Sequence, residues 1–162
     1  SLYFAWKLFQ VDAVDFSENA IESLKKFSQE KWLSLNTHVW NTLEYDFLEE
    51  KYDVIYACNS LHYFNTENTN IIIEKLKKSL KKGWYIFIRV KSVDDTDFGK
   101  WEKIAENFYK NGWDLKYYFE IDFMKTLFSD FEILELQALQ DTHNKIYGWT
   151  TINWFIDLVA KK

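Results

Sequence analysis

A short strand pattern that runs directly into an amphipathic helix constrains the fold more than any other feature of the chain. Val11-Asp-Ala-Val-Asp15 reads as a buried strand, and the apolar positions of Glu18–Lys26 recur with the period of a helix. Ser17, between them, is a favourable N-cap residue. The pattern predicts an open α/β sheet with Asp15 at the carboxyl end of a strand, where acidic side chains accept hydrogen bonds from ribose hydroxyls.

The same alternation of strands and helices continues through the middle of the chain. After the tail of a helix over residues 1–9, the sequence predicts helices at 18–31 and 67–82 and strands at 11–15, 35–40, 53–59 and 85–90. The run Asp53–Asn59 is almost continuously apolar, which is typical of a strand covered on both faces.

The rhythm changes after residue 91. The sequence predicts a solvated polar loop at Asp94–Asp97, helices at 100–111 and 120–129, and two antiparallel strands at 131–139 and 150–160, separated by a polar segment over 140–147. Together these elements predict an α/β fold: a Rossmann-like, mostly parallel sheet with helices on both faces and a C-terminal antiparallel strand pair, in one domain over residues 1–162.

Composition excludes several classes of function. The net charge of −5 gives no electrostatic footprint for nucleic acid. Apolar runs are far shorter than the roughly 20 residues of a membrane-spanning helix, and we expect no membrane partner. A single cysteine, Cys58, fits a cytoplasmic protein. His38, His62 and His143 lack the spacing of a metal site, so we expect no metal.

Glycine is scarce and tryptophan abundant. The chain has four glycines, where ordinary usage of about 7% gives roughly 11, and eight tryptophans. Several tryptophans stand in turn contexts that favour glycine: Trp32, Trp40, Trp84, Trp101 and Trp113. One interpretation is an aromatic-rich chain from an AT-rich genome. The other is that these positions are UGA codons, which some bacterial lineages read as glycine.

Three segments, Val11–Leu24, Tyr52–Phe64 and Leu76–Val90, resemble class I S-adenosylmethionine (AdoMet)-dependent methyltransferases. The C-terminal half is most similar to their small tellurite-resistance-type branch. The resemblance implies the sheet order 3-2-1-4-5-7-6, with the strands predicted here as the second to the seventh. It also implies AdoMet as cofactor and methyl transfer to a small-molecule acceptor.

The chain departs from that family at its beginning. No glycine-rich GxGxG-type loop lies upstream of Asp15, so we expect an N-terminally truncated fragment without the first strand and its glycine loop. That strand is central in the family's sheet, and its absence exposes two inner edges. Either the second and fourth strands close up on one another, or the fragment is unstable alone.

The resemblance assigns candidate site residues at three strand ends. Asp15 would bind the ribose, with Phe16 and Ser17 beside the adenosine. Asn41, Thr42 and Leu43 follow the next strand, where the family usually presents an acidic residue to the adenine amino group. Asn59 and Leu61 would lie beside the methionine moiety, and His62 or Tyr63 would face the acceptor. No catalytic residue is identified, because in-line transfer needs mainly donor and acceptor held about 3 Å apart.

Simpler interpretations stay open. Ser17 can be only a cap, His62 can be buried in a turn, and Tyr117–Phe119 can be aromatic core. The lysines of the predicted helix at 67–82 can form a solvated face: Lys77, Lys78, Lys81 and Lys82. As whole-chain alternatives, the sequence allows a non-catalytic methyltransferase remnant or another Rossmann-like enzyme such as an NAD-dependent oxidoreductase. The oligomeric state is open.

Overall fold

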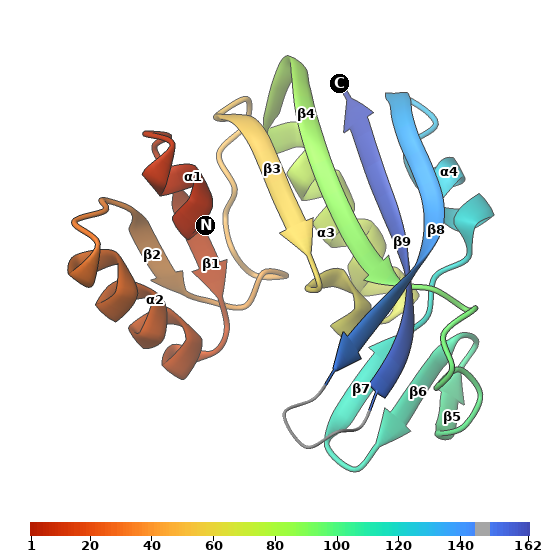
Figure 1. Cartoon of the computed structure of the whole chain (residues 1–162). Helices are drawn as coiled ribbons and strands as arrows, with labels where there is room; N and C mark the ends of the chain where they lie inside the picture. The colour runs from red at the N-terminus through yellow and green to blue at the C-terminus, as the bar shows by residue number, and fades with distance from the viewer. Residues whose placement is uncertain (145–149) are drawn as a thin grey trace. The chain divides into compact units, whose positions relative to one another are not determined.

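The computed structural model describes residues 1–144 and 150–162 (Figure 1). The chain forms two compact units, Ser1–Asp46 and Phe47–Lys162. Each unit has its own sheet, and each is described by itself below.

The first unit is a strand–helix–strand motif preceded by a short helix. It contains α1 (Leu2–Trp6), β1 (Asp12–Asp15), α2 (Glu18–Glu30) and β2 (Asn36–Val39). β1 and β2 pair in parallel, so their carboxyl ends share one edge. The side chain of Ser17 accepts a hydrogen bond from the Ala20 N–H at 3.2 Å, which confirms the predicted N-cap of α2. Ile21 is the buried apolar residue of that helix.

The second unit is built on a four-stranded sheet in the order β3-β4-β9-β8 (Figure 1). β3 (Tyr52–Cys58) pairs with β4 (Leu80–Lys91) in parallel, and β9 (Thr150–Lys161) lies antiparallel to both β4 and β8 (Glu132–Asn144). The connections are a 3₁₀ turn, η1 (Leu61–Tyr63), with α3 (Thr66–Ser79), and α4 (Ile121–Leu127). This is the predicted strand order 4-5-7-6, and the fold class is confirmed.

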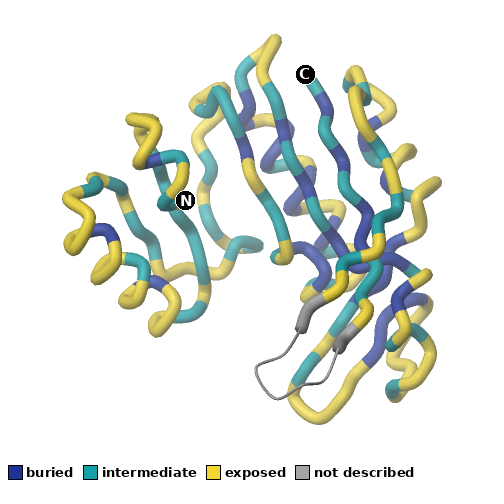
Figure 2. Tube along the Cα trace, in the orientation of Figure 1, coloured by how far each residue is buried: buried dark blue, intermediate teal, exposed yellow. Residues whose placement is uncertain are grey.

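The core of the second unit lies between this sheet and its helices. Alternate residues of β4 are buried because successive side chains point to opposite faces of a strand (Figure 2). Ile72, Ile73 and Leu76 of α3 are likewise buried, and α3 contacts β4. Ile71, in contrast, is exposed. The deepest aromatic residues are Tyr118, Phe119 and Phe128.

The prediction of a helix at 100–111 is wrong. That segment forms β5 (Glu102–Ala105) and β6 (Phe108–Asn111), which continue into β7 (Asp114–Tyr117) as a three-stranded antiparallel sheet. Asn111 pairs with Asp114, so Gly112 and Trp113 form a two-residue hairpin loop, with Gly112 at φ 61°. Glycine with positive φ at the first loop position favours a hairpin over a helix.

Four smaller predictions also differ from the structure. α3 ends at Ser79, so Lys81 and Lys82 belong to β4, and Lys77 is buried rather than solvated. Asp95, in the loop predicted to be solvated, is buried as well. β8 extends through Asn144 into the segment predicted to be polar loop, whose residues 145–147 lie outside the described part of the chain. Tyr56 of β3 is exposed, so that strand is not covered on both faces within its unit.

Candidate functional site

The carboxyl end of β1 presents Asp15 in a defined orientation. Its Oδ1 accepts the Ser17 N–H at 2.9 Å, and the side chain is half-buried. Within the described residues no second partner holds Oδ2. The backbone of α2 therefore fixes the carboxylate while leaving an oxygen that can accept a hydroxyl. This geometry fits the ribose of a nucleoside cofactor.

The other predicted cofactor residues of the first unit lie at the same edge of its sheet. The Trp40 N–H donates to the Asp15 carbonyl at 2.9 Å, so Asn41, Thr42 and Leu43 follow directly beside the end of β1. The Phe16 side chain is 73% exposed, which leaves its ring accessible to an adenosine. The Asn41 Oδ1 accepts the Leu43 N–H at 3.0 Å, so this oxygen already holds a local turn. The amide NH₂ of Asn41 is a donor, unlike the acidic side chain that the family usually places there.

In the second unit, the predicted residues follow β3 at the carboxyl edge of its sheet. Asn59 has φ 60°, and its N–H donates to the Arg89 carbonyl of β4 at 2.9 Å, so the chain turns sharply there. Leu61 is buried, and its carbonyl accepts the Phe64 N–H at 3.2 Å. Its side chain therefore belongs to the core. Tyr63 is partly exposed, and its ring lies 4.5 Å from that of His62.

His62 is the most unusual polar residue of this edge. It is 3% exposed, and its Nδ1 has no hydrogen-bond partner among the residues that the structure describes. Burial, assisted by the positive charges of Lys116 and Lys91, lowers the pKa of His62 to about 4. The imidazole is therefore neutral at physiological pH. A buried, unpartnered and neutral nitrogen is able to accept a hydrogen bond or a proton from a ligand.

Sequence reasoning missed the charged groups around His62. The Lys91 Nζ lies 2.7 Å from the Asp95 Oδ2, and the Lys116 Nζ lies 2.8 Å from the Asp114 Oδ2. These ion pairs come from the end of β4, the loop after it, and β7, which contacts η1. The signal for Asp95 was present in the Asp94–Asp97 run, but nothing in that run marks which carboxylate is buried.

Buried aromatic side chains accompany this polar centre. Tyr118 is fully buried, and within the described residues its hydroxyl also has no hydrogen-bond partner. Burial and the negative charge of Asp95 raise the pKa of Tyr118 above its usual value. Its ring makes edge contacts with Phe98 and Tyr109. The rings of Tyr117–Phe119 therefore belong to the aromatic core, as the simpler interpretation predicted. Among the described residues, the Tyr118 hydroxyl is a second buried polar group without a hydrogen-bond partner.

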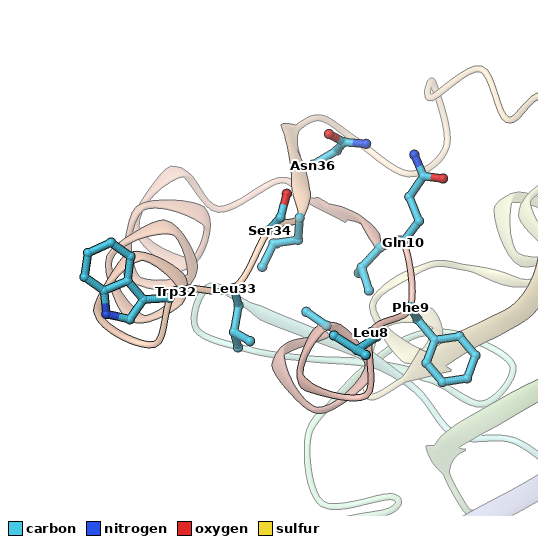
Figure 3. Close-up of a pocket in the computed structure, with 10 residues that line it drawn as sticks. Leu8, Phe9, Gln10, Trp32, Leu33, Ser34 and Asn36 are labelled. Carbon is cyan, nitrogen blue, oxygen red and sulfur yellow. The ribbon is translucent and has the colours of Figure 1, made fainter.

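The first unit also contains a pocket of about 410 Å³ (Figure 3). Residues that precede β1 and β2 line it, among them Leu8, Phe9, Leu33 and Leu35. The pocket is therefore at the amino ends of these strands, whereas Asp15 is at the carboxyl end of β1. It does not coincide with the predicted cofactor residues.

Comparison with known proteins identifies the family. A model of the methyltransferase domain matches residues 1–83, about half of the chain, and the chain belongs to this family. The match includes every predicted cofactor-binding residue. It favours a methyltransferase over the alternative of an NAD-dependent oxidoreductase. No curated protein matches the chain.

Solved structures show the same fold. TehB from Haemophilus influenzae is 20% identical with a TM-score of 0.78, and the alignment covers all of this chain but 53% of TehB. A SAM-dependent methyltransferase from Methanosarcina mazei is 16% identical with a TM-score of 0.75, covering 99% and 85% of the two chains. A 1,6-didemethyltoxoflavin-N1-methyltransferase from Burkholderia thailandensis, solved with its substrate and S-adenosylhomocysteine, is 16% identical with a TM-score of 0.71, covering 99% and 64%. The predicted class I methyltransferase fold is confirmed.

The described residues offer neither a membrane-spanning helix nor a metal site. None of their helices is both long and apolar enough to cross a membrane. In the same residues, no group of three or more His, Cys, Asp and Glu side chains is placed to hold a metal ion.

Proposed function

We propose that this chain is part of an AdoMet-dependent methyltransferase that acts on a small-molecule acceptor. One observation carries the proposal: the carboxylate of Asp15, within the segment that matches the family, is fixed by the Ser17 N–H at 2.9 Å and keeps an oxygen for a ribose hydroxyl. The neighbouring exposed ring of Phe16 supports a nucleoside ligand at the same place.

In this proposal, the residues of the chain mainly bind and orient. Asp15 accepts the ribose hydroxyls, Phe16 covers the adenosine, and the N-cap at Ser17 holds both in place. Residues 41–43 border the adenine, where the Asn41 amide oxygen, which keeps a second lone pair beside its bond from the Leu43 N–H, accepts from the adenine amino group in place of the usual carboxylate. AdoMet supplies an activated methyl group, so the protein needs no strong nucleophile of its own.

The acceptor side is proposed to lie at the end of β3. Backbone groups of Asn59 and Leu61 border the methionine moiety, and Tyr63 and His62 face the acceptor. The unpartnered Nδ1 of His62 supports this role because the neutral imidazole is able to accept a hydrogen bond from an O–H or N–H of the acceptor. The Burkholderia thailandensis neighbour was solved with 1,6-didemethyltoxoflavin bound, which is a small molecule and supports that class of acceptor.

We also propose that the cofactor site is completed by a strand and glycine-rich loop outside this sequence. Residues 1–82 contain no glycine, so the chain has no GxGxG segment near Asp15. In the described residues, β1 pairs only with β2 and β3 only with β4, which leaves one edge of each strand without a strand partner. An additional parallel strand would satisfy the backbone groups of such edges. A cytoplasmic location is proposed on the free thiol of Cys58.

Isothermal titration calorimetry with S-adenosylhomocysteine tests the proposal. The chain as printed and a version extended by its upstream coding sequence are titrated in parallel, with NAD as the competing ligand. We expect the extended version to bind S-adenosylhomocysteine and not NAD. Binding to neither version contradicts the proposed function and favours the alternative of a non-catalytic remnant.

A further inference from the structure

The end of α2 has the backbone geometry of a glycine, although the sequence places tryptophan there. The Leu33 N–H donates to the Ser28 carbonyl at 2.8 Å, and the Trp32 N–H donates to the Gln29 carbonyl at 3.1 Å. These two bonds define a Schellman motif, in which the residue after the C-cap adopts the left-handed conformation. Trp32 occupies that position with φ 54°. Glycine is the usual residue there because a Cβ atom is strained in this conformation.

The indole ring of Trp32 gains nothing that offsets the strain. The side chain is 95% exposed, so almost no apolar surface leaves the solvent. Among the described residues it has no ring, cation or hydrogen-bond contact through its side chain. Figure 3 shows its ring extending from the end of α2. A bulky residue with positive φ and no packing is an outlier that glycine would remove.

Three other tryptophans also expose much of their surface: Trp113 in a turn, Trp40 just after β2 and Trp84 within β4. Trp113 completes the two-residue loop between β6 and β7, and its side chain is fully exposed at 102% of the reference area. Trp84 follows Gly83, which has φ 85°, and Trp40 directly follows β2. Both are substantially exposed. Tryptophan is normally highly buried on average, so four unpacked copies in one small chain are unexpected.

Other tryptophans of the chain differ in position or packing. Trp154 is a half-buried residue within β9, and Trp6, although 63% exposed in α1, has the Lys7 Nζ 4.3 Å from its ring centroid. The ring of Trp101 contacts Tyr118, and the Lys116 Nζ lies 4.7 Å from its centroid. Trp101 is one of the tryptophans that the sequence places in turn contexts, but its ring is packed. It is therefore not included in the inference below.

We infer that Trp32, Trp40, Trp84 and Trp113 are glycines in the native protein, encoded by UGA in an organism that reads this codon as glycine. The substitution raises the glycine count from four to eight and leaves four tryptophans, which brings the glycine content closer to ordinary usage of about 7%. It also places glycine at the Schellman position of α2, the one of these four positions whose φ is positive. This inference is independent of the proposed function.

Two measurements test the inference on the gene and on the native protein. Sequencing of the gene is expected to show UGA at codons 32, 40, 84 and 113, and UGG at codon 154, which serves as the internal control. Peptide mass spectrometry of the protein isolated from its own organism is expected to show glycine at the four positions. UGG at codon 32 or 113 overturns the inference, and so does UGA combined with tryptophan in the corresponding peptides.

Expression of the unmodified gene gives a third readout. In a host that uses UGA as a stop codon, synthesis is expected to end after Lys31, so no full-length chain is made. In a host supplied with a glycine tRNA that reads UGA, the full chain is expected. Full-length product in the first host overturns the inference.

Discussion

Replacing Asp95 with alanine should cost more stability than replacing both members of its ion pair with neutral residues. The Asp95 side chain is completely buried, and its Oδ2 lies 2.7 Å from the Lys91 Nζ. The same Oδ2 accepts the Trp154 N–H at 2.9 Å, and the Oδ1 accepts the Asp97 N–H at 3.0 Å. Lys91 in turn donates to the Asn153 Oδ1 at 2.6 Å. The pair therefore joins the loop after β4 to β9.

The magnitudes follow from what each substitution leaves behind. Asp95→Ala leaves Lys91 as a buried charge without its partner, which costs about 3–5 kcal/mol. The double variant Lys91→Met/Asp95→Asn removes both charges, and the Asn oxygen can still accept the Trp154 N–H. The hydrogen bonds that it loses should cost about 1–2 kcal/mol. The double variant is thus expected to be more stable than the single one.

Urea unfolding of the full chain, followed by far-ultraviolet circular dichroism, measures this difference. With a slope of roughly 2 kcal/mol per M, a loss of 4 kcal/mol lowers the midpoint by about 2 M. Glu106→Ala is the control, because it breaks the exposed Lys103–Glu106 ion pair and should leave the midpoint unchanged. A double variant that is less stable than Asp95→Ala would refute the reasoning about the unpaired buried charge.

Three further perturbations probe other sites. Burial holds the pKa of His62 at about 4, whereas an exposed imidazole has a pKa of 6.5. The free energy of unfolding should therefore be highest above pH 6.5 and fall by up to about 3 kcal/mol as the pH is lowered to 4. Urea titrations of His62→Gln should show a flatter profile, and an equal decline would contradict the assignment. Asp15→Asn in the upstream-extended chain should weaken S-adenosylhomocysteine binding roughly 10–100-fold by calorimetry, through the loss of charge-assisted hydrogen bonds, whereas Glu18→Gln should not. Trp32→Gly should raise the free energy of unfolding by about 0.5–1 kcal/mol, because it removes the Cβ atom at a positive φ. Trp32→Ala keeps the Cβ atom and should not raise it. Equal urea midpoints for the two variants would argue against strain at this position.

The residues proposed for cofactor binding in the first unit could be selected from sequence because the local structure around them is set by a short segment. Asp15 and Ser17 are two residues apart, and the strand end, the carboxylate and the N-cap lie within one short run. The strands themselves were accessible from periodicity, whereas their order came from the family resemblance alone. β3, β4, β9 and β8 follow the order that the resemblance implies.

The three strands over residues 102–117 were not predicted because their local sequence is ambiguous, whereas the helix expected at 120–129 is present as α4. Lys103, Ile104 and Phe108 allow a helical pattern, whereas the hairpin depends on Gly112, which has a positive φ at the first position of the loop. This turn residue favours the hairpin over the helix.

The burial of Lys77 has a similar origin. Its Nζ lies 2.6 Å from the Asp130 Oδ1, a partner 53 residues further along the chain, and 5.3 Å from the centroid of the Phe128 ring. A lysine-rich helix end reads as solvated until the partner from a distant segment is known. Local sequence carries no sign of that partner.

The same distinction explains why the acceptor cannot be read from this chain. The groups proposed for cofactor binding near the ends of β1 and β2 are each positioned by their own short sequence. The residues around His62 instead come from η1, the end of β4 and β7. Lys91 of β4 also contacts Asn153 of β9, which lies 62 residues further along the chain. Because AdoMet provides the reactivity, we expect acceptor preference to depend on the shape and polarity of the surface around His62 rather than on one catalytic motif. We therefore expect that substitutions in residues 92–119 change acceptor preference, whereas substitutions at Asp15 change cofactor affinity for every acceptor.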